Sequence, residues 1–366
     1  MKNALAVVVV LAVLSGLGCD RLPSYAQWER HFSGPDFVEP VAIIRAPDSG
    51  YAVIAEIRDR WTSATGVWLL RLDDEGDTLW TRGWAIGQST VPDDVLIAQD
   101  GEYCVSGRTN NPCANTPFLA LADEIWGMMV GCDTWPELTG DGPCHVSSAD
   151  SGALMLACQT HSPNPFRANI LLQRIAPYGY VYWSRFYTLD TTTAGFRDLT
   201  ALPGGNYCLV GAEWAMGVSR TGDSLWFRDY RSLGSVDFHD ACATSDGGLL
   251  LSGSVYTETG ARMLCARTDS LGSLVWSYQV SDPPSGGRAG IQSSLGACYV
   301  VGSFGRDMES GGLVIKLNSQ GQPEWQRELV EADDGWFVAI AEAPDRDLVV
   351  LGYSGNDGLC LVKMTP

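Results

Sequence analysis

Four acidic side chains are the best candidates for chemistry in this sequence. Each stands a few residues before an alanine in an apolar stretch, and the four are Glu39, Asp94, Asp198 and Asp240. Carboxylates that face one another across a channel either raise one another's pKa or bind a hard cation such as Ca²⁺. The sequence therefore predicts a channel-mouth site for a cation or ligand; no organic cofactor is expected, and the cation that this site suggests is calcium. The competing interpretation is that these acids are solvated residues where strands begin.

The cysteines divide into two groups. Those within apolar runs are typical of small buried residues, and they are Cys104, Cys208, Cys242, Cys265, Cys298 and Cys360. The second group could include a disulfide in an exported protein, and it consists of Cys113, Cys132, Cys144 and Cys158. We predict the pair Cys132 and Cys144, which would close the loop of residues 133–143. His145 and His161 stand beside this group, but without a Cys-x-x-Cys motif no zinc site is predicted.

Familiar catalytic motifs are absent from the sequence. It contains no Gly-x-Ser-x-Gly elbow, no His-Glu-x-x-His helix and no phosphate-binding glycine loop. Any function therefore depends on elements that bring scattered side chains together.

Those elements repeat along the chain. A short apolar run that begins or ends near Gly recurs at residues 50–55, 101–107, 152–157, 205–211, 248–253, 296–302 and 347–352. The period is about 50 residues, which is typical of propellers and solenoids. In the first unit, strands are expected at residues 41–46, 50–57, 67–72 and 77–84. The hairpin turn at residues 73–76 begins with Asp and ends with Gly, which supplies the positive φ.

Four antiparallel strands per unit and seven units predict an all-β, seven-bladed β-propeller over residues 28–366. The last unit stops after its third strand at residues 358–364, and residues 27–32 have the pattern of a fourth strand. We therefore expect the N-terminal strand to complete the last blade, which closes the ring and removes its open edges.

A tryptophan recurs at one position of most units, and these residues are Trp28, Trp80, Trp183, Trp226, Trp276 and Trp325. One large aromatic residue per blade predicts repeated packing between blades. Trp135 and Trp214 lie off the repeat position and are better candidates for a binding surface.

The motif Asp-Gly-Gly-Leu at residues 246–249, with Arg-Leu-Asp followed by Gly and Trp at residues 71–80, resembles the degenerate β-propeller repeats of secreted bacterial proteins. The resemblance covers nearly all of the chain after the leader. It implies the fold and carries no catalytic residue to this sequence.

The N-terminal residues resemble a lipoprotein-type signal peptide. Residues 5–17 are apolar, follow Lys2 and end at Gly18-Cys19, a run that is short for a membrane span. We expect residues 1–18 to be removed, Cys19 to be acylated, and residues 19–27 to link the propeller to a membrane of the bacterial cell envelope. Gly16 departs from the usual pattern, and cleavage near Ala26 without acylation is the alternative.

The net charge of −19 disfavours nucleic acid as a partner. The favoured function is a non-catalytic interaction module, monomeric as a domain, that binds a protein or glycan partner. One alternative is a glycan-cleaving enzyme that uses two channel carboxylates, and the other is a structural scaffold of an envelope complex.

Overall fold

The computed structural model describes residues 25–34, 37–87, 89–111, 114–125, 127–135, 140, 142–160, 167–190, 195–306, 309–329, 335–355 and 358–366. The expected signal peptide, the acylation site Cys19 and most of the linker lie outside the described residues, as do Cys113 and His161. No helix in the described part of the chain is long and apolar enough to cross a membrane.

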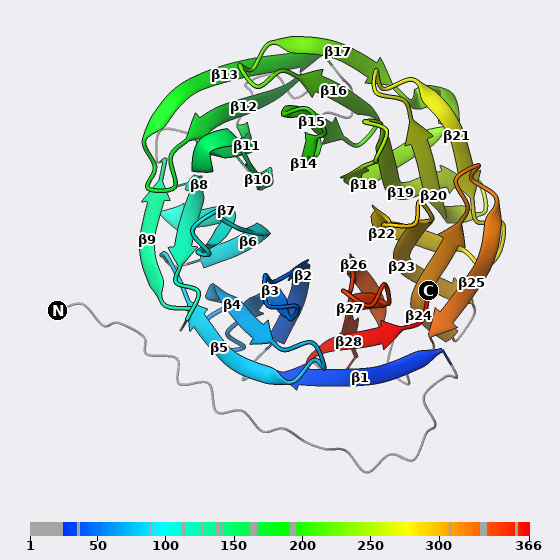
Figure 1. Ribbon diagram of the computed structural model, residues 1–366, viewed down its shortest axis with the longest axis horizontal. Helices are drawn as coiled ribbons and strands as arrows, with labels where there is room; N and C mark the ends of the chain where they lie inside the picture. The colour runs from blue at the N-terminus through cyan, green and yellow to red at the C-terminus, as the bar shows by residue number, and fades with distance from the viewer. Residues whose placement is uncertain are drawn as a thin grey trace.

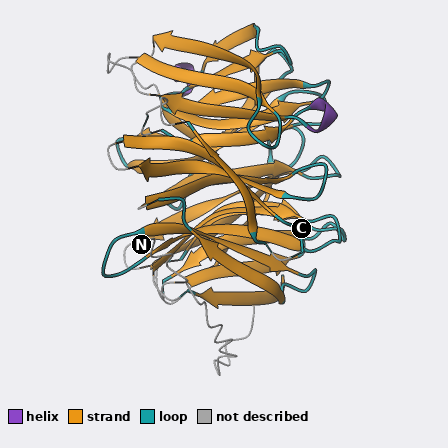
Figure 2. Ribbon diagram, turned by 90° about the vertical axis from the view of Figure 1, so that its left-hand side faces the viewer, coloured by secondary structure: helices purple, strands orange, loops and turns teal. Residues whose placement is uncertain are grey.

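The described strands form seven four-stranded antiparallel sheets that follow one another around a ring (Figure 1). Seen from the edge in Figure 2, the connecting turns lie on the two sides of this ring. The seven-bladed β-propeller expected from the repeats is confirmed.

The strands of each blade run in chain order from the innermost to the outermost. Blade 1 is β2 (Phe37–Arg45), β3 (Tyr51–Arg58), β4 (Thr65–Leu72) and β5 (Thr78–Trp84). Blade 2 is β6 (Ser89–Ile97), β7 (Tyr103–Asn111), β8 (Ala114–Ala122) and β9 (Met129–Thr134). Blade 3 is β10 (Cys144–Ser148), β11 (Leu154–Thr160), β12 (Arg167–Ile175) and β13 (Val181–Asp190). Blade 4 is β14 (Phe196–Leu202), β15 (Asn206–Gly211), β16 (Trp214–Val218) and β17 (Ser224–Asp229).

The remaining blades follow the same order until the chain ends. Blade 5 is β18 (Ser235–Ala243), β19 (Leu249–Thr257), β20 (Gly260–Thr268) and β21 (Leu274–Gln279). Blade 6 is β22 (Ser285–Gln292), β23 (Cys298–Arg306), β24 (Glu309–Leu317) and β25 (Pro323–Leu329). Blade 7 is β26 (Trp336–Glu342), β27 (Leu348–Ser354), β28 (Gly358–Met364) and the N-terminal β1 (Ala26–Ser33). Two short 3₁₀ segments, Asp150–Gly152 and Arg231–Leu233, lie between strands.

The N-terminal strand closes the ring, as expected from the sequence. β1 pairs antiparallel with β28 from Ala26 opposite Met364 to Ser33 opposite Gly358, and the two strands lie side by side in Figure 1. Trp28 and Phe32 are buried in a core shared with blade 1. The N-terminal strand is therefore held by its pairing with β28 and by its packing against blade 1.

A β-bulge interrupts the innermost strand of six blades. The ladder skips one residue in each, and the skipped residues are Val41, Asp93, Arg197, His239, Arg288 and Val338. A bulge changes the direction of a side chain and bends its strand. At this bend a Cβ on Gly107 or Gly253 would collide with the innermost strand's backbone, so the fold requires the glycine that ends these apolar runs.

The recurring tryptophans pack between blades, as expected. Trp226 lies against the turn of the next blade, where a Cβ added at Gly272 would be 2.5 Å from the indole Cζ3 atom. Trp183 lies in the same way against Gly222. The two off-repeat tryptophans are also buried, with 8% of Trp135 and 1% of Trp214 exposed. The expectation that these two form a binding surface is wrong, because packing inside the propeller covers their indole groups.

Candidate functional site

Two cavities meet at the inner ends of blades 5 and 6. A central cavity of about 400 Å³ is lined by the innermost strands and contains Asp94, His145, Asp198 and Asp240. A wider groove of about 710 Å³ lies between blades 5, 6 and 7. His239 and Arg288 line both spaces. The bulges of β18 and β22 therefore place these two side chains where the groove opens into the centre of the ring.

Three of the four predicted acids come together in the central cavity. Asp94, Asp198 and Asp240 each follow the bulge residue of their strand. Glu39 does not join them, because in β2 the residue after the bulge is Ala42 and Glu39 lies exposed beside Pro40. The grouping of Glu39 with the other three was therefore wrong. The reference alanines are not equivalent: Ala42 itself occupies the position of the acids, whereas Ala98, Ala201 and Ala243 come three or four residues after them.

Each of these carboxylates holds two blades together. Asp94 Oδ2 accepts a hydrogen bond of 3.1 Å from the backbone N–H of Val146, which belongs to the next blade. Asp198 Oδ2 accepts one of 3.0 Å from Ala241, and Asp240 Oδ2 accepts one of 2.8 Å from Gly290. Carboxylates that accept backbone hydrogen bonds contribute strongly to stability when buried. The acids are thus part of the ring's structure.

His145 is the site residue that the sequence did not reveal. Its Nδ1 atom lies 3.6 Å from Asp94 Oδ2 and 3.5 Å from Asp198 Oδ1. Burial opposes a charge on this imidazole, but contact with Asp94 and the charges of Asp198, Asp94 and Asp93 outweigh burial and raise the His145 pKa to about 9. The imidazole is therefore protonated at neutral pH. Only its place on an innermost strand could have pointed to this role.

Two acids of the central cavity, Asp198 and Asp240, hold protons more tightly than ordinary carboxyl groups. Burial, together with the charge of Asp198, raises the pKa of Asp240 to about 7. Burial also raises the pKa of Asp198, although His145 and two backbone N–H groups act in the opposite direction. The cluster therefore changes charge near neutral pH.

Arg288 is the distinctive residue of the groove. Its side chain is exposed, and within the described residues its guanidinium has no hydrogen-bond or ion-pair partner. By contrast, the equivalent bulge residue of blade 4, Arg197, forms an ion pair of 3.0 Å with Asp237. No acidic residue is among the described residues that line the groove. Arg288 therefore supplies an unpaired positive charge in a chain of net charge −19.

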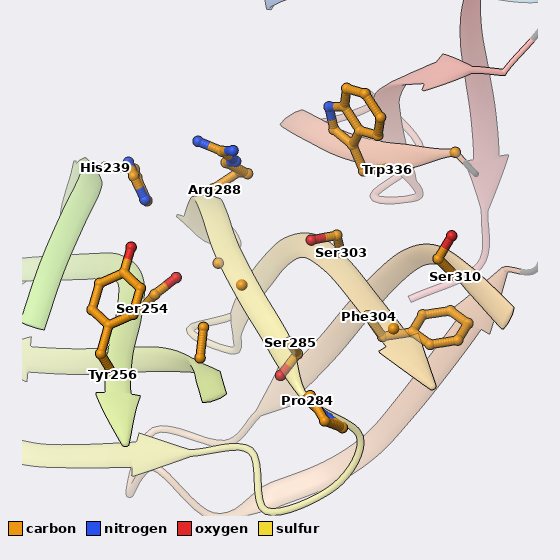
Figure 3. A pocket seen from close by; sticks show the side chains of 15 residues that line it. His239, Ser254, Tyr256, Pro284, Ser285, Arg288, Ser303, Phe304, Ser310 and Trp336 are labelled. Carbon is orange, nitrogen blue, oxygen red and sulfur yellow. The ribbon is translucent and has the colours of Figure 1, made fainter. Parts of the chain in front are cut away.

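Aromatic and hydroxyl side chains complete the groove. Figure 3 shows Arg288 between His239 and Trp336, with Tyr256 and Ser254 on the His239 side. Tyr256 is 52% exposed, and Trp336 stacks on Tyr353 with ring centroids 4.7 Å apart. Burial, with the nearby charges of Arg288 and Arg197, lowers the His239 pKa to about 4 even though Asp237 opposes this shift. The His239 imidazole is therefore neutral at pH 7 and can donate and accept hydrogen bonds.

The disulfide differs from the predicted one. Cys144 is bonded to Cys158, which lies opposite it on the adjacent strand with a Cα–Cα distance of 4.2 Å. Cys132 is free and exposed on β9, the outermost strand of the preceding blade. The predicted pair of Cys132 and Cys144 was wrong, because residues close in sequence here belong to opposite edges of two different blades.

Possible metal ligands also occur away from the cavities. Within the described residues, Glu29, His31 and Cys360 place their candidate ligand atoms within 4.8 Å of one another. The channel acids form no comparable group among the described residues.

Comparison with known proteins places the chain by its fold. No protein-family model matches the sequence, and no curated protein matches it. A streptogramin B lyase structure is 11% identical and has a TM-score of 0.63, covering 92% of this chain and 98% of the lyase. BBS1N, solved in complex with ARL6DN, is 10% identical with a TM-score of 0.58, covering 93% and 96% of the two chains. The Pan2 WD40 domain of Neurospora crassa is 9% identical with a TM-score of 0.56, covering 90% of each chain.

Proposed function

We propose that this chain is a non-catalytic binding module that takes an exposed, carboxylate-bearing segment of a partner protein into the groove between blades 5, 6 and 7. The observation that carries this proposal is the exposed Arg288 guanidinium, which has no acid partner among the described residues. The groove that it faces contains no acidic side chain among its described lining residues. The planar guanidinium donates two parallel hydrogen bonds to a carboxylate.

The walls of the groove suit a polypeptide segment. Tyr256 and Trp336 offer large rigid surfaces, the kind of side chain that contributes most of the binding energy at protein interfaces. Ser254 and Ser303 add hydroxyl groups that can pair with a partner's backbone. The neutral His239 adds a donor and an acceptor at the inner end of the groove.

Binding is favoured over the glycan-cleaving alternative by the state of the acids. A glycosidase needs two carboxyl groups that flank the scissile bond and remain available for proton transfer and attack. Asp94, Asp198 and Asp240 instead accept backbone hydrogen bonds across the blade boundaries. A structural neighbour, BBS1N, was solved in complex with a protein, ARL6DN, which agrees with a protein-binding use of this fold.

We place this module at the bacterial cell envelope, with residues 1–18 removed and Cys19 acylated, so that a short linker holds the propeller near a membrane. Mass spectrometry of the mature N-terminal peptide tests this placement. An acylated Cys19 is expected, together with release of the Cys19→Ser variant into the soluble fraction. An unmodified terminus near Ala26 would overturn the anchoring and leave the groove proposal standing.

The binding function is tested with an array of peptides of varied sequence, each carrying either free or amidated acidic groups. We expect a subset of the peptides with free carboxylates to bind, and Arg288→Ala to weaken that binding about 10- to 100-fold. Tyr256→Ala should weaken the same subset. Arg220→Ala is the matched control, because Arg220 is also exposed but does not line the groove. Equal binding by the wild type and the Arg288→Ala variant would refute the proposal.

A further inference from the structure

A group of three possible metal ligands lies on the strand pair that closes the ring. Glu29 and His31 are on β1, and Cys360 lies directly opposite His31 on β28. Side chains at alternate positions of a strand share one face of the sheet, so Glu29 and His31 project to the side on which Cys360 lies. This side faces blade 6, since Cys360 belongs to a core that includes Val314 and Leu329.

The donor atoms are already close together. His31 Nε2 lies 2.7 Å from Glu29 Oε1, and Cys360 Sγ lies 3.7 Å from the same oxygen. A tetrahedral Zn²⁺ site with ordinary zinc–ligand bond lengths separates its donor atoms by about 3.3–3.6 Å. The sulfur and oxygen atoms therefore need almost no movement. The half-exposed His31 ring must move so that its Nε2 atom lies several tenths of an ångström farther from Glu29 Oε1.

The chemistry of the donors selects the class of metal. Thiolate, imidazole and carboxylate together are ligands for Zn²⁺ and similar borderline cations. Ca²⁺ requires six to eight oxygen atoms, whereas this group offers one carboxylate. Cys360 is buried, Glu29 is one-quarter exposed and His31 is half exposed, so the group opens to solvent on its His31 side. Water can thus reach a fourth coordination position.

We propose that Glu29, His31 and Cys360 form a zinc-binding site that fastens the N-terminal strand to the C-terminal strand. On binding, the Cys360 thiol releases its proton to solvent and the ion replaces the His31–Glu29 hydrogen bond. In the unfolded chain Cys360 is more than 300 residues from its two co-ligands, so the complete site exists only in the closed ring. Zinc therefore stabilises ring closure. This inference is independent of the groove and its partner.

The test measures the unfolding temperature of the purified full-length chain after chelator treatment and after addition of Zn²⁺. At a zinc concentration about 100 times the dissociation constant, we expect Tm to rise by about 5 °C. His31→Gln and Glu29→Gln, both on the open side of the site, should each remove most of this rise without unfolding the protein. Cys132→Ser is the matched thiol control and should keep the full rise, because Cys132 is exposed on the distant strand β9.

A second measurement tests whether a thiolate binds the metal at the site that contains His31. Co²⁺ added to the Cys132→Ser variant should produce a thiolate-to-cobalt charge-transfer band, and this band should be lost when His31→Gln is added. Three results would overturn the proposal: no rise in Tm with zinc, an equal rise in the His31→Gln variant, or cobalt binding without the thiolate band.

Discussion

The Nδ1 atom of His145 lies 3.5 Å from the Oδ1 atom of Asp198, although the two residues belong to different blades. The same nitrogen is 3.6 Å from Asp94 of the preceding blade. One imidazolium therefore connects blades 2, 3 and 4 at the centre of the ring. The sequence led us to expect a metal cation in this place, and the chain supplies a protonated histidine there.

The His145 contacts predict that stability falls at alkaline pH. Its pKa is about 9 in the folded chain and 6.5 when unperturbed, so the folded state binds the proton more tightly. The stabilisation is complete below about pH 6.5 and is lost as the pH rises to about 9, with a total on the order of 3 kcal/mol. Urea unfolding of the wild type and of His145→Gln over this range measures it. The variant should show a much smaller decline, and an equal decline would contradict the assignment.

Asp240 predicts a second pH dependence of stability, and Asp240→Asn separates it from that of His145. Burial and Asp198 raise the Asp240 pKa from 3.8 to about 7, so the folded state holds an extra proton between those values. The contribution of Asp240 to stability therefore decreases as the pH rises from about 4 to 7, because the unfolded chain ionises first. This lower window should flatten in Asp240→Asn, while the window above pH 6.5 should remain. Loss of both windows would show that the two groups act as one unit.

The contacts of Asp198 between blades predict a large difference between two acids that the sequence grouped together. Asp198→Ala leaves the N–H groups of Leu199 and Ala241 without their acceptor and removes a partner of His145. We expect a loss of about 3–5 kcal/mol in the free energy of unfolding. Glu39→Ala is the control, and it should change stability by less than about 0.5 kcal/mol because Glu39 is exposed. Similar losses in the two variants would contradict the structure.

The packing of tryptophan on the next blade predicts the cost of one methyl group. At Gly272 the backbone has φ +73°, and an added Cβ would lie 2.5 Å from Trp226 Cζ3. Gly272→Ala should therefore cost about 2–4 kcal/mol, from backbone strain and from displacement of the indole. Gly296→Ala is the matched control, because Gly296 has φ +87° in a similar turn with nothing within 4 Å of its Cβ position. Its expected cost is about 1 kcal/mol. Equal Tm values for the two variants would exclude the packing contribution.

In this structure, calcium binding in the central cavity depends on whether His145 occupies the acids. A Ca²⁺ ion in the central cavity must compete with the His145 imidazolium for Asp94 and Asp198. We therefore expect added Ca²⁺ to leave Tm unchanged in the wild type at pH 7 and to raise it in His145→Gln. Adding Asp198→Asn to the His145→Gln variant should abolish the calcium-dependent rise in Tm. A calcium-dependent rise in the wild type at pH 7 would show that the ion displaces or bypasses His145.

Much of the fold could be predicted because its signals are local. Alternating apolar residues specify the strands, and Asp and Gly at fixed positions specify the hairpin turns. The incomplete last unit and the extra strand at the N-terminus predicted that β1 pairs with β28, since an open sheet edge is costly. Even the packing of Trp226 followed from repetition, because each blade presents the same surface to the next.

The site could be predicted only in part, because it depends on contacts between blades. Asp94, Asp198 and Asp240 were found by their type, but Glu39 was included wrongly because Ala42, the alanine used as its reference, itself occupies the position of the acids. Apart from its place on an innermost strand, His145 gave no signal, since its two acid partners lie about 50 residues away on either side. The partner of Cys144 was misassigned for a related reason: strand pairing, rather than loop length, brings Cys158 opposite it.

The sequence by itself determined the blades, their number and the strand that closes the ring, because these depend on patterns within single units. Only the tertiary structure decided which side chains of different units meet. It placed Arg288 in a groove whose described lining has no acid, and it left Arg197, at the same position of another blade, paired with Asp237. The physical reason is that equivalent bulges bring one residue from each of six blades toward a shared centre, where charge and burial depend on neighbours that no single repeat contains.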